Sequence, residues 1–259
     1  MSVIVIPEWT FSPPGYFEEP VHMTREAYGM TIADGKVEAR VDSSVFDSDS
    51  SIRQSLHEAL SDRFLGVQVL THRPYQLSGP TMTRLHPDGR RDRFIEPESG
   101  EIKLSGETLD IQVRDKDDNV LMDTRRERVH RKGDLAELVE KYRAKDAVLA
   151  SLLRSYHAAV RDPDNELVHL FEIRDALTRR FEGETEARSV LGISSRSWSR
   201  LGRLANAEPL RQGRHRGKAE GPLRDATESE LAEARVIALR LNEAYLGYLD
   251  ATNCPEAGS

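Results

Sequence analysis

The sequence predicts an α+β protein, with an N-terminal antiparallel β-rich domain that contains one helix and a C-terminal all-α bundle. Two patterns predict this division. Up to about residue 132, short alternating apolar runs flank Asp-Gly pairs, which are typical of hairpin turns. Beyond it, apolar residues recur every three or four positions, the period of a helix that packs on a core. We therefore expect domains at 1–132 and 133–251, followed by a flexible tail at 252–259.

The β-rich domain is predicted from three hairpins, two further strands and one helix. The expected strand pairs are 28–32 with 36–41, 82–85 with 92–95, and 109–113 with 120–122, and single strands are expected at 3–6 and 67–70. The expected helix follows Ser50 or Ser51 and ends at Gly66. Residues 115–119, DKDDN, begin like a calcium loop, but Val120 and Arg126 stand where that loop needs Gly and Glu. We interpret them as a solvated turn.

The helical domain is predicted from residues that start and stop helices. Acidic and hydroxyl side chains suit the first helical turn, proline suits its first position, and glycine suits the position after the last turn. The expected starts are Asp134, Asp146, Asp162 with Pro163, Ser194 or Ser195, and a capping box of Thr227 with Glu230. The expected stops are Gly183 and Gly192. In the helix after Pro163, Arg174 is the one polar member of the apolar stripe.

Length and composition limit the class of protein. The chain has 259 residues, of which 31% are charged and 38% hydrophobic, as in a globular protein with much exposed surface. The apolar opening at 3–6 is too short for a signal peptide, and no run approaches a membrane span. Cys254 is the single cysteine, which excludes an intrachain disulfide and fits a reducing cytoplasm. We expect a cytoplasmic protein with no membrane partner, no cofactor and no metal.

A basic run late in the helical domain is the strongest electrostatic feature of the sequence. Residues 196–218 carry seven cations and one carboxylate, a net charge of +6 in a chain of net charge −7. One interpretation is a surface that faces phosphates. Its candidate nucleic-acid-binding residues are Arg200, Arg203, Arg211, Arg214, His215, Arg216 and Lys218. The alternative is a solvated face in which Arg214 and Arg216 pair with carboxylates such as Glu172 or Asp175.

Arg211 and His215 are the candidate catalytic residues. Arg214 and Arg216 flank His215, and like charge on both sides would lower the pKa of its imidazole. A neutral imidazole can act as a general base, and arginines can hold a phosphodiester. Together these groups could cleave RNA without a metal, with the 2′-OH as nucleophile. The sequence contains no G-x-S-x-G, Walker, G-x-G-x-x-G or H-E-x-x-H motif.

The late RHRG sequence (214–217), followed by a closing helix, resembles HEPN-like domains of bacterial proteins, including those with an ApeA-like C-terminus. The resemblance covers roughly residues 146–250. It implies a homodimer and a metal-independent ribonuclease of a toxin or anti-phage defence system. The motif of that family is Arg, four to six residues, then His. Arg211 and His215 are separated by three residues, whereas Arg125 and His130 match the spacing.

The sequence therefore leaves three functions open. The first is an HEPN-like protein that binds RNA rather than DNA, or cleaves it, through the basic run. The second is a non-enzymatic dimeric scaffold or sensor module whose basic loop binds an acidic protein partner. The third is a ligand-binding β domain with a structural helical appendage.

Overall fold

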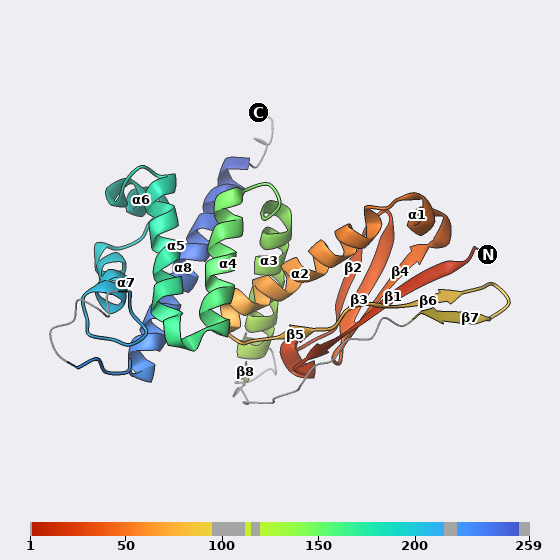
Figure 1. The fold of residues 1–259 in the computed structure, drawn as a ribbon, viewed down its shortest axis with the longest axis horizontal. Coiled ribbons are helices and arrows are strands. Elements are labelled where there is room, and N and C mark those ends of the chain that lie inside the picture. The colour runs from red at the N-terminus through yellow and green to blue at the C-terminus, as the bar shows by residue number, and fades with distance from the viewer. Residues whose placement is uncertain (1, 95–111, 115–119, 215–221, 254–259) are drawn as a thin grey trace. The chain divides into compact units, whose positions relative to one another are not determined.

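The computed structural model describes residues 2–94, 112–114, 120–214 and 222–253 (Figure 1). It is α+β, as the sequence predicts, with an antiparallel sheet in the N-terminal part and helices in the C-terminal part. The chain forms two compact units. The sheet unit comprises Met1–Phe64 and Tyr75–Gly133, and the helical unit comprises Leu65–Pro74 and Asp134–Ser259. The second unit thus includes a short segment that lies before residue 132 in the sequence.

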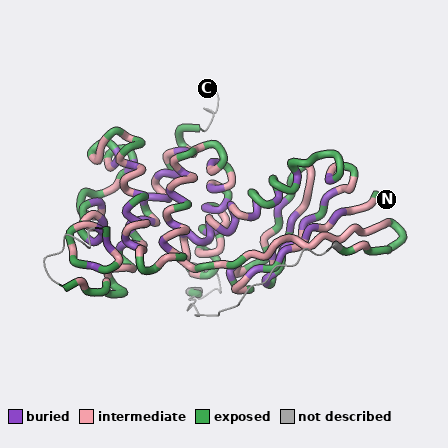
Figure 2. Tube along the Cα trace, viewed as in Figure 1, coloured by how far each residue is buried: buried purple, intermediate pink, exposed green. Residues whose placement is uncertain are grey.

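The sheet unit is built on an antiparallel sheet whose order is β2-β3-β4-β1-β6-β7, with β5 paired to β1. Its strands are β1 (Ile4–Ser12), β2 (Val21–Thr24), β3 (Tyr28–Ala33), β4 (Lys36–Asp42), β5 (Gln76–Leu77), β6 (Thr81–Leu85) and β7 (Arg91–Phe94). Buried and less buried residues alternate along β1, so one face of this strand forms the core (Figure 2). A 3₁₀ turn, Pro14–Tyr16, follows β1, and helix α1 (Ser43–Ser48) follows β4.

The hairpin predictions are confirmed for the described residues. β3 and β4 pair across Asp34 and Gly35, whose φ angles of 49° and 77° suit the tight turn that an Asp-Gly pair favours. β6 and β7 form the second hairpin. The third consists of β8 (Gln112–Arg114) and β9 (Val120–Asp123), which form a separate two-stranded sheet. Residues 109–111 and the DKDDN segment lie outside the described residues.

The predicted strand at 67–70 is wrong, because helix α2 runs from Ile52 to Thr71 without a break. Gly66 is a position of close approach between helices rather than a stop signal. A Cβ atom there would lie 2.5 Å from the Cα of Ala136, so only glycine fits. The short apolar run after Gly66 looked like a strand because four apolar or amide residues carry no clear helical period.

The predicted helix start at Asp134 is also wrong, because α3 spans Thr124–Tyr142. Asp123 Oδ1 accepts a hydrogen bond from the Arg126 N–H at 2.9 Å, which is a capping contact. Arg128 and Lys132 both pair with Glu18. The hydrogen bond from Arg128 lowers the pKa of the Glu18 carboxyl to about 2. This charged first half of α3 has no apolar stripe, which is why periodicity alone missed it.

The remaining helices, apart from the start of α5, follow the predicted caps closely. They are α4 (Ala147–Arg161), α5 (Glu166–Arg180), α6 (Glu184–Leu191), α7 (Ser195–Asn206) and α8 (Glu228–Asn253). Side chains of Asp146 and Ser194 accept N–H groups of the first turns of α4 and α7, and Gly192 closes α6 with φ 63°. Thr227 and Glu230 form the capping box of α8. Pro163–Asn165 form a 3₁₀ turn, so α5 begins at Glu166 rather than at Pro163.

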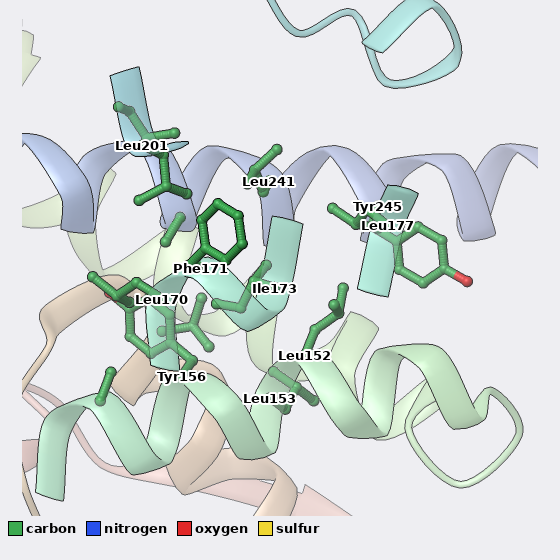
Figure 3. Packing of buried hydrophobic residues seen from close by; sticks show 14 of the residues in the cluster. Leu152, Leu153, Tyr156, Leu170, Phe171, Ile173, Leu177, Leu201, Leu241 and Tyr245 are labelled. Atoms are coloured by element: carbon green, nitrogen blue, oxygen red, sulfur yellow. The ribbon is translucent and has the colours of Figure 1, made fainter. Parts of the chain in front are cut away.

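The core of the helical unit forms where α5 packs against α4, α7 and α8 (Figure 3). Leu170, Phe171, Ile173 and Leu177 of α5 are all buried there. Burying side chains of this size contributes about 1.5–3 kcal/mol each. Among the described residues, no helix combines the length and apolar content that crossing a bilayer requires.

Arg174 accounts for the polar position in the buried stripe of α5. Its guanidinium lies 5.1 Å from the Phe171 ring centroid and 5.3 Å from that of Trp198. Nη2 donates to Glu184 Oε2 at 3.0 Å. A Cβ on Gly202 would lie 2.1 Å from Nη1, so the missing side chain in α7 leaves room for the arginine. Arg174 therefore joins α5, α6 and α7 through its charge and its flat face.

Candidate nucleic-acid interface

The candidate interface is built on the C-terminal end of α7. Beyond that helix, the chain turns back: the Glu208 N–H donates to Arg203 O at 3.0 Å and the Arg214 N–H donates to Ala205 O at 2.7 Å. Gly213 permits this return, since a Cβ there would lie 2.9 Å from Ala205 O. The fold-back places Arg203, Arg211 and Arg214 on or beside the last turn of one helix.

A second segment of the chain, which contains Arg224, is hydrogen-bonded to the residues after the same end of α7. Leu210 and Arg224 form a parallel bridge. The Arg211 N–H donates to Arg224 O at 2.9 Å, and the Arg224 N–H donates to Pro209 O at 3.0 Å. Arg214 and Arg224, which bracket residues 215–221, are thus both held by main-chain bonds to the region around the end of α7.

Two of the predicted binding residues are held by carboxylates of the protein. Arg200 donates from Nη1 to Glu208 at 2.6 Å and from Nε to Glu233 at 2.8 Å. Arg214 donates to Asp175 Oδ2 at 2.9 Å, and its guanidinium lies 4.8 Å from the Phe171 ring centroid. Asp175 is one of the two carboxylates that the alternative interpretation of the sequence named for Arg214. These two arginines hold α7 and the chain after it against α8 and α5. We call this arrangement the platform.

Arg203 and Arg211 are less engaged than the other two. Arg203 is exposed, and within the described part of the chain its side chain has no hydrogen bond or ion pair. Arg211 is 63% exposed and approaches only Asp225, with 3.8 Å between Nη1 and Oδ2. Because both partners of that pair are largely in water, the contact is worth less than about 1 kcal/mol. Both guanidinium groups remain available to an anion.

The other predicted residues are not placed. His215, Arg216 and Lys218 lie outside the described residues, so the Arg211–His215 pair has only its arginine located. The second candidate pair, Arg125 and His130, lies on α3. Residues five apart on a helix stand about 140° apart around its axis, so these two side chains leave on different faces. Arg125 also donates to Glu18 O at 3.2 Å.

Arg224 is a residue of this region that the sequence analysis missed. Its guanidinium donates to both carboxylate oxygens of Glu230, at 2.6 and 2.8 Å, and lies 3.3 Å from Glu208 Oε2. The hydrogen bond from Arg224 holds the pKa of Glu230 well below its ordinary value. The available signal was a lone arginine three residues before the Thr227–Glu230 capping box. Arg224 connects the start of α8 to the chain beside Arg211.

A second polar cluster, also missed, lies where α2 ends. His72 has φ 51°, and its Nε2 lies 3.4 Å from Oε1 of the buried Glu166. Arg235 donates to both oxygens of Glu166, at 2.6 and 2.9 Å. Burial, together with the charge of Arg235, lowers the pKa of His72 to about 4. His72, Glu166 and Arg235 lie far apart in the sequence, so spacing alone could not indicate this cluster.

The His72 cluster joins the chain after α2 to α5 and α8. The Nδ1 atom of His72 is buried and has no hydrogen-bond partner among the described residues. Elsewhere in the described ranges, no group of three or more His, Cys, Asp or Glu side chains is arranged to hold a metal ion. A comparison with known proteins finds no family model, curated protein or solved structure that matches this chain.

Proposed function

We propose that the helical unit binds RNA through the C-terminal end of α7, with Arg203 and Arg211 as phosphate contacts. The observation that carries the proposal is their availability: both are exposed, and neither is held by a close ion pair among the described residues. The planar guanidinium fork suits the oxygens of a phosphate group. The sequence adds three more basic residues, His215, Arg216 and Lys218, directly after the anchored Arg214.

The ion-paired arginines take a different part in this proposal. Arg200 and Arg214 stabilise the platform, because each joins α7 or the chain after it to another helix: Glu233 lies on α8 and Asp175 on α5. Their charge is compensated locally, so they add little to the attraction of RNA. The binding surface is therefore smaller than the basic run suggests.

The resemblance to HEPN-like domains extends the proposal. It favours RNA over DNA, a homodimer, and a role in a bacterial toxin or anti-phage system. The charge pattern of the sequence, rather than the family spacing, assigns cleavage to Arg211 and His215. His215 would take the proton of the 2′-OH as that oxygen attacks the phosphorus, Arg211 would hold the phosphate, and the 5′-oxygen would leave. These extensions rest on the sequence and are separable from binding.

Binding is tested with a fluorescein-labelled single-stranded RNA and two charge-matched double variants of the full chain. Arg203→Ala with Arg211→Ala removes the proposed contacts, and we expect a loss in affinity of about tenfold or more. Arg154→Ala with Arg179→Ala removes two other exposed arginines, from α4 and α5. We expect this control to bind nearly as well as the wild type. Equal losses in the two double variants would refute the assignment.

Cleavage is tested on the same RNA in the presence of a metal chelator. We expect His215→Ala to abolish cleavage and to keep most of the binding, because one imidazole is removed while the arginines remain. If the wild-type protein leaves the RNA intact, the cleavage assignment is contradicted, and the binding assay alone decides whether it binds RNA.

The scaffold function remains the second candidate, and one observation favours it. Arg200, Arg214 and Arg224 are compensated by carboxylates of the protein, so the surface is less cationic than its sequence. A protein-binding surface needs less charge than one that competes with salt for phosphates. This alternative predicts that polyglutamate of matched charge binds as tightly as the RNA and displaces it. The RNA proposal predicts clearly weaker binding of polyglutamate.

A further inference from the structure

A small cavity lies at the other end of α7. Its volume is about 160 Å³, and it is lined by Gly192, Ile193, Ser194, Ser197, Ile237 and Arg240. The link between α6 and α7 forms one wall and α8 forms the other. Ser197 of the lining and Arg203 are six residues apart on α7, which is about 9 Å along the helix axis, and they point to different faces of the helix.

Arg240 is the group of this cavity that is available to a ligand. The two serine hydroxyls are engaged, since Ser194 Oγ accepts the Ser197 N–H at 3.1 Å and bonds the Ser197 Oγ at 2.9 Å. Arg240 is exposed, and its guanidinium has no hydrogen bond or ion pair to any residue that the structure describes. The mouth of the cavity therefore carries one uncompensated positive charge beside two isoleucines.

Two exposed aliphatic residues lie close in the sequence to residues that line the cavity. In the helical unit, Val190 and Val236 are the large hydrophobic residues that are left exposed among the described ones, at 41% and 48%. Val190 lies two residues before Gly192. Val236 precedes Ile237 and lies one helical turn before Arg240 on α8. Neither valine lines the cavity, so the large apolar side chains of its lining are those of Ile193 and Ile237.

We propose that this cavity docks a segment of a partner protein in which an aliphatic side chain stands next to a carboxylate. The aliphatic group enters between Ile193 and Ile237, and the carboxylate pairs with Arg240. Pockets for small molecules have about 300–1,000 Å³, so a cavity of this size suits a single side chain. No aromatic side chain lines it for base stacking, which sets it apart from the surface proposed for RNA.

The proposal is tested on the full chain with labelled glycine–serine peptides that carry Leu-Glu, Ser-Glu, Leu-Gln or Leu-Lys at the centre. We expect saturable binding of the Leu-Glu peptide, and binding about tenfold weaker when either side chain is replaced. Arg240→Glu should lose the Leu-Glu peptide and gain the Leu-Lys peptide, because the charge pair is restored with reversed sign. Arg154→Glu, an equal charge change at an exposed position of α4, should leave peptide binding unchanged.

Three results would overturn the proposal. They are no saturable binding of the Leu-Glu peptide up to about 1 mM, equal binding of the Ser-Glu peptide, and equal effects of Arg240→Glu and Arg154→Glu. Thermal melts of both variants confirm that each is folded, since both positions are exposed. Unchanged RNA binding by Arg240→Glu would show that the two surfaces act separately, whereas displacement of RNA by the peptide would contradict their separation.

Discussion

His72 shows how one residue couples the stability of the fold to pH. Its imidazole packs edge-on against Tyr156, with 5.4 Å between ring centroids, and faces Glu166 and Arg235. The side chain is only 17% exposed. Burial therefore favours the neutral imidazole and lowers its pKa to about 4, from 6.5 in an unfolded chain.

We expect acid to weaken the fold through His72 between pH 6.5 and about 4. The unfolded chain binds a proton at the higher pKa, so the contribution of neutral His72 is complete above pH 6.5 and is lost as the pH falls. The loss is at most about 3 kcal/mol. Denaturant unfolding across this window measures it.

His72→Asn is the matched variant for this prediction. Asparagine tolerates the positive φ angle and does not titrate, so the variant should show a flatter pH dependence than the wild type. His157, whose pKa is lowered by burial, titrates in both proteins and cancels in the difference. Parallel pH curves for the wild type and His72→Asn would contradict a buried neutral imidazole.

Among the helices, α2 and α3 approach each other closely at Gly66. The Cβ of an alanine there would lie 2.5 Å from the Cα and 2.9 Å from the Cβ of Ala136. Both contacts involve main chain or its first side-chain atom, so neither can move without shifting a helix. Gly247 of α8 has no atom within 4 Å of a Cβ and is exposed.

We expect Gly66→Ala and Gly247→Ala to change stability in opposite directions. Alanine favours a helix over glycine by about 1 kcal/mol, so Gly247→Ala should raise the free energy of unfolding by about that amount. Gly66→Ala gains the same propensity but is overpacked, which costs typically 1–3 kcal/mol and more where backbone must shift. Urea unfolding compares them. Stabilisation by both substitutions would show that α2 and α3 are not in close contact.

The sequence predicted elements where local chemistry decides them. The Asp34-Gly35 turn and the Thr227–Glu230 capping box need only neighbouring residues, and both are present in the structure. The strand predicted at 67–70 is wrong because these residues continue helix α2, which packs against a helix that is distant in the sequence. The start predicted at Asp134 is wrong because the first half of α3 is charged and has no apolar stripe.

The positive charge of the candidate site could be predicted from the sequence, but the ion pairs that its arginines form could not. Its arginines are visible in the sequence as a basic run. Their partners are 33 residues away for Arg200 and Glu233 and 39 residues away for Arg214 and Asp175. Only the fold brings these carboxylates to them. Arg203 and Arg211 therefore could not be separated from Arg200 and Arg214 by spacing or composition.

In the molecule as a whole, the local charge around the basic run is smaller than the charge of the run in the sequence. The run at 196–218 has a net charge of +6, but carboxylates of α5 and α8 compensate two of its arginines. We therefore assign attraction for RNA to a few groups at one end of α7. Few contacts predict a shallow dependence of binding on salt, in contrast to a fully exposed basic run.

The most direct test of the RNA contact is the slope of the logarithm of affinity against the logarithm of salt concentration. Each phosphate contact to a single strand contributes about 0.7 to that slope. We expect Arg203→Ala with Arg211→Ala to lower the slope by about 1.4 relative to the wild type, and Arg154→Ala with Arg179→Ala to leave it unchanged. An unchanged slope in the first double variant would show that Arg203 and Arg211 do not contact the phosphates of the RNA.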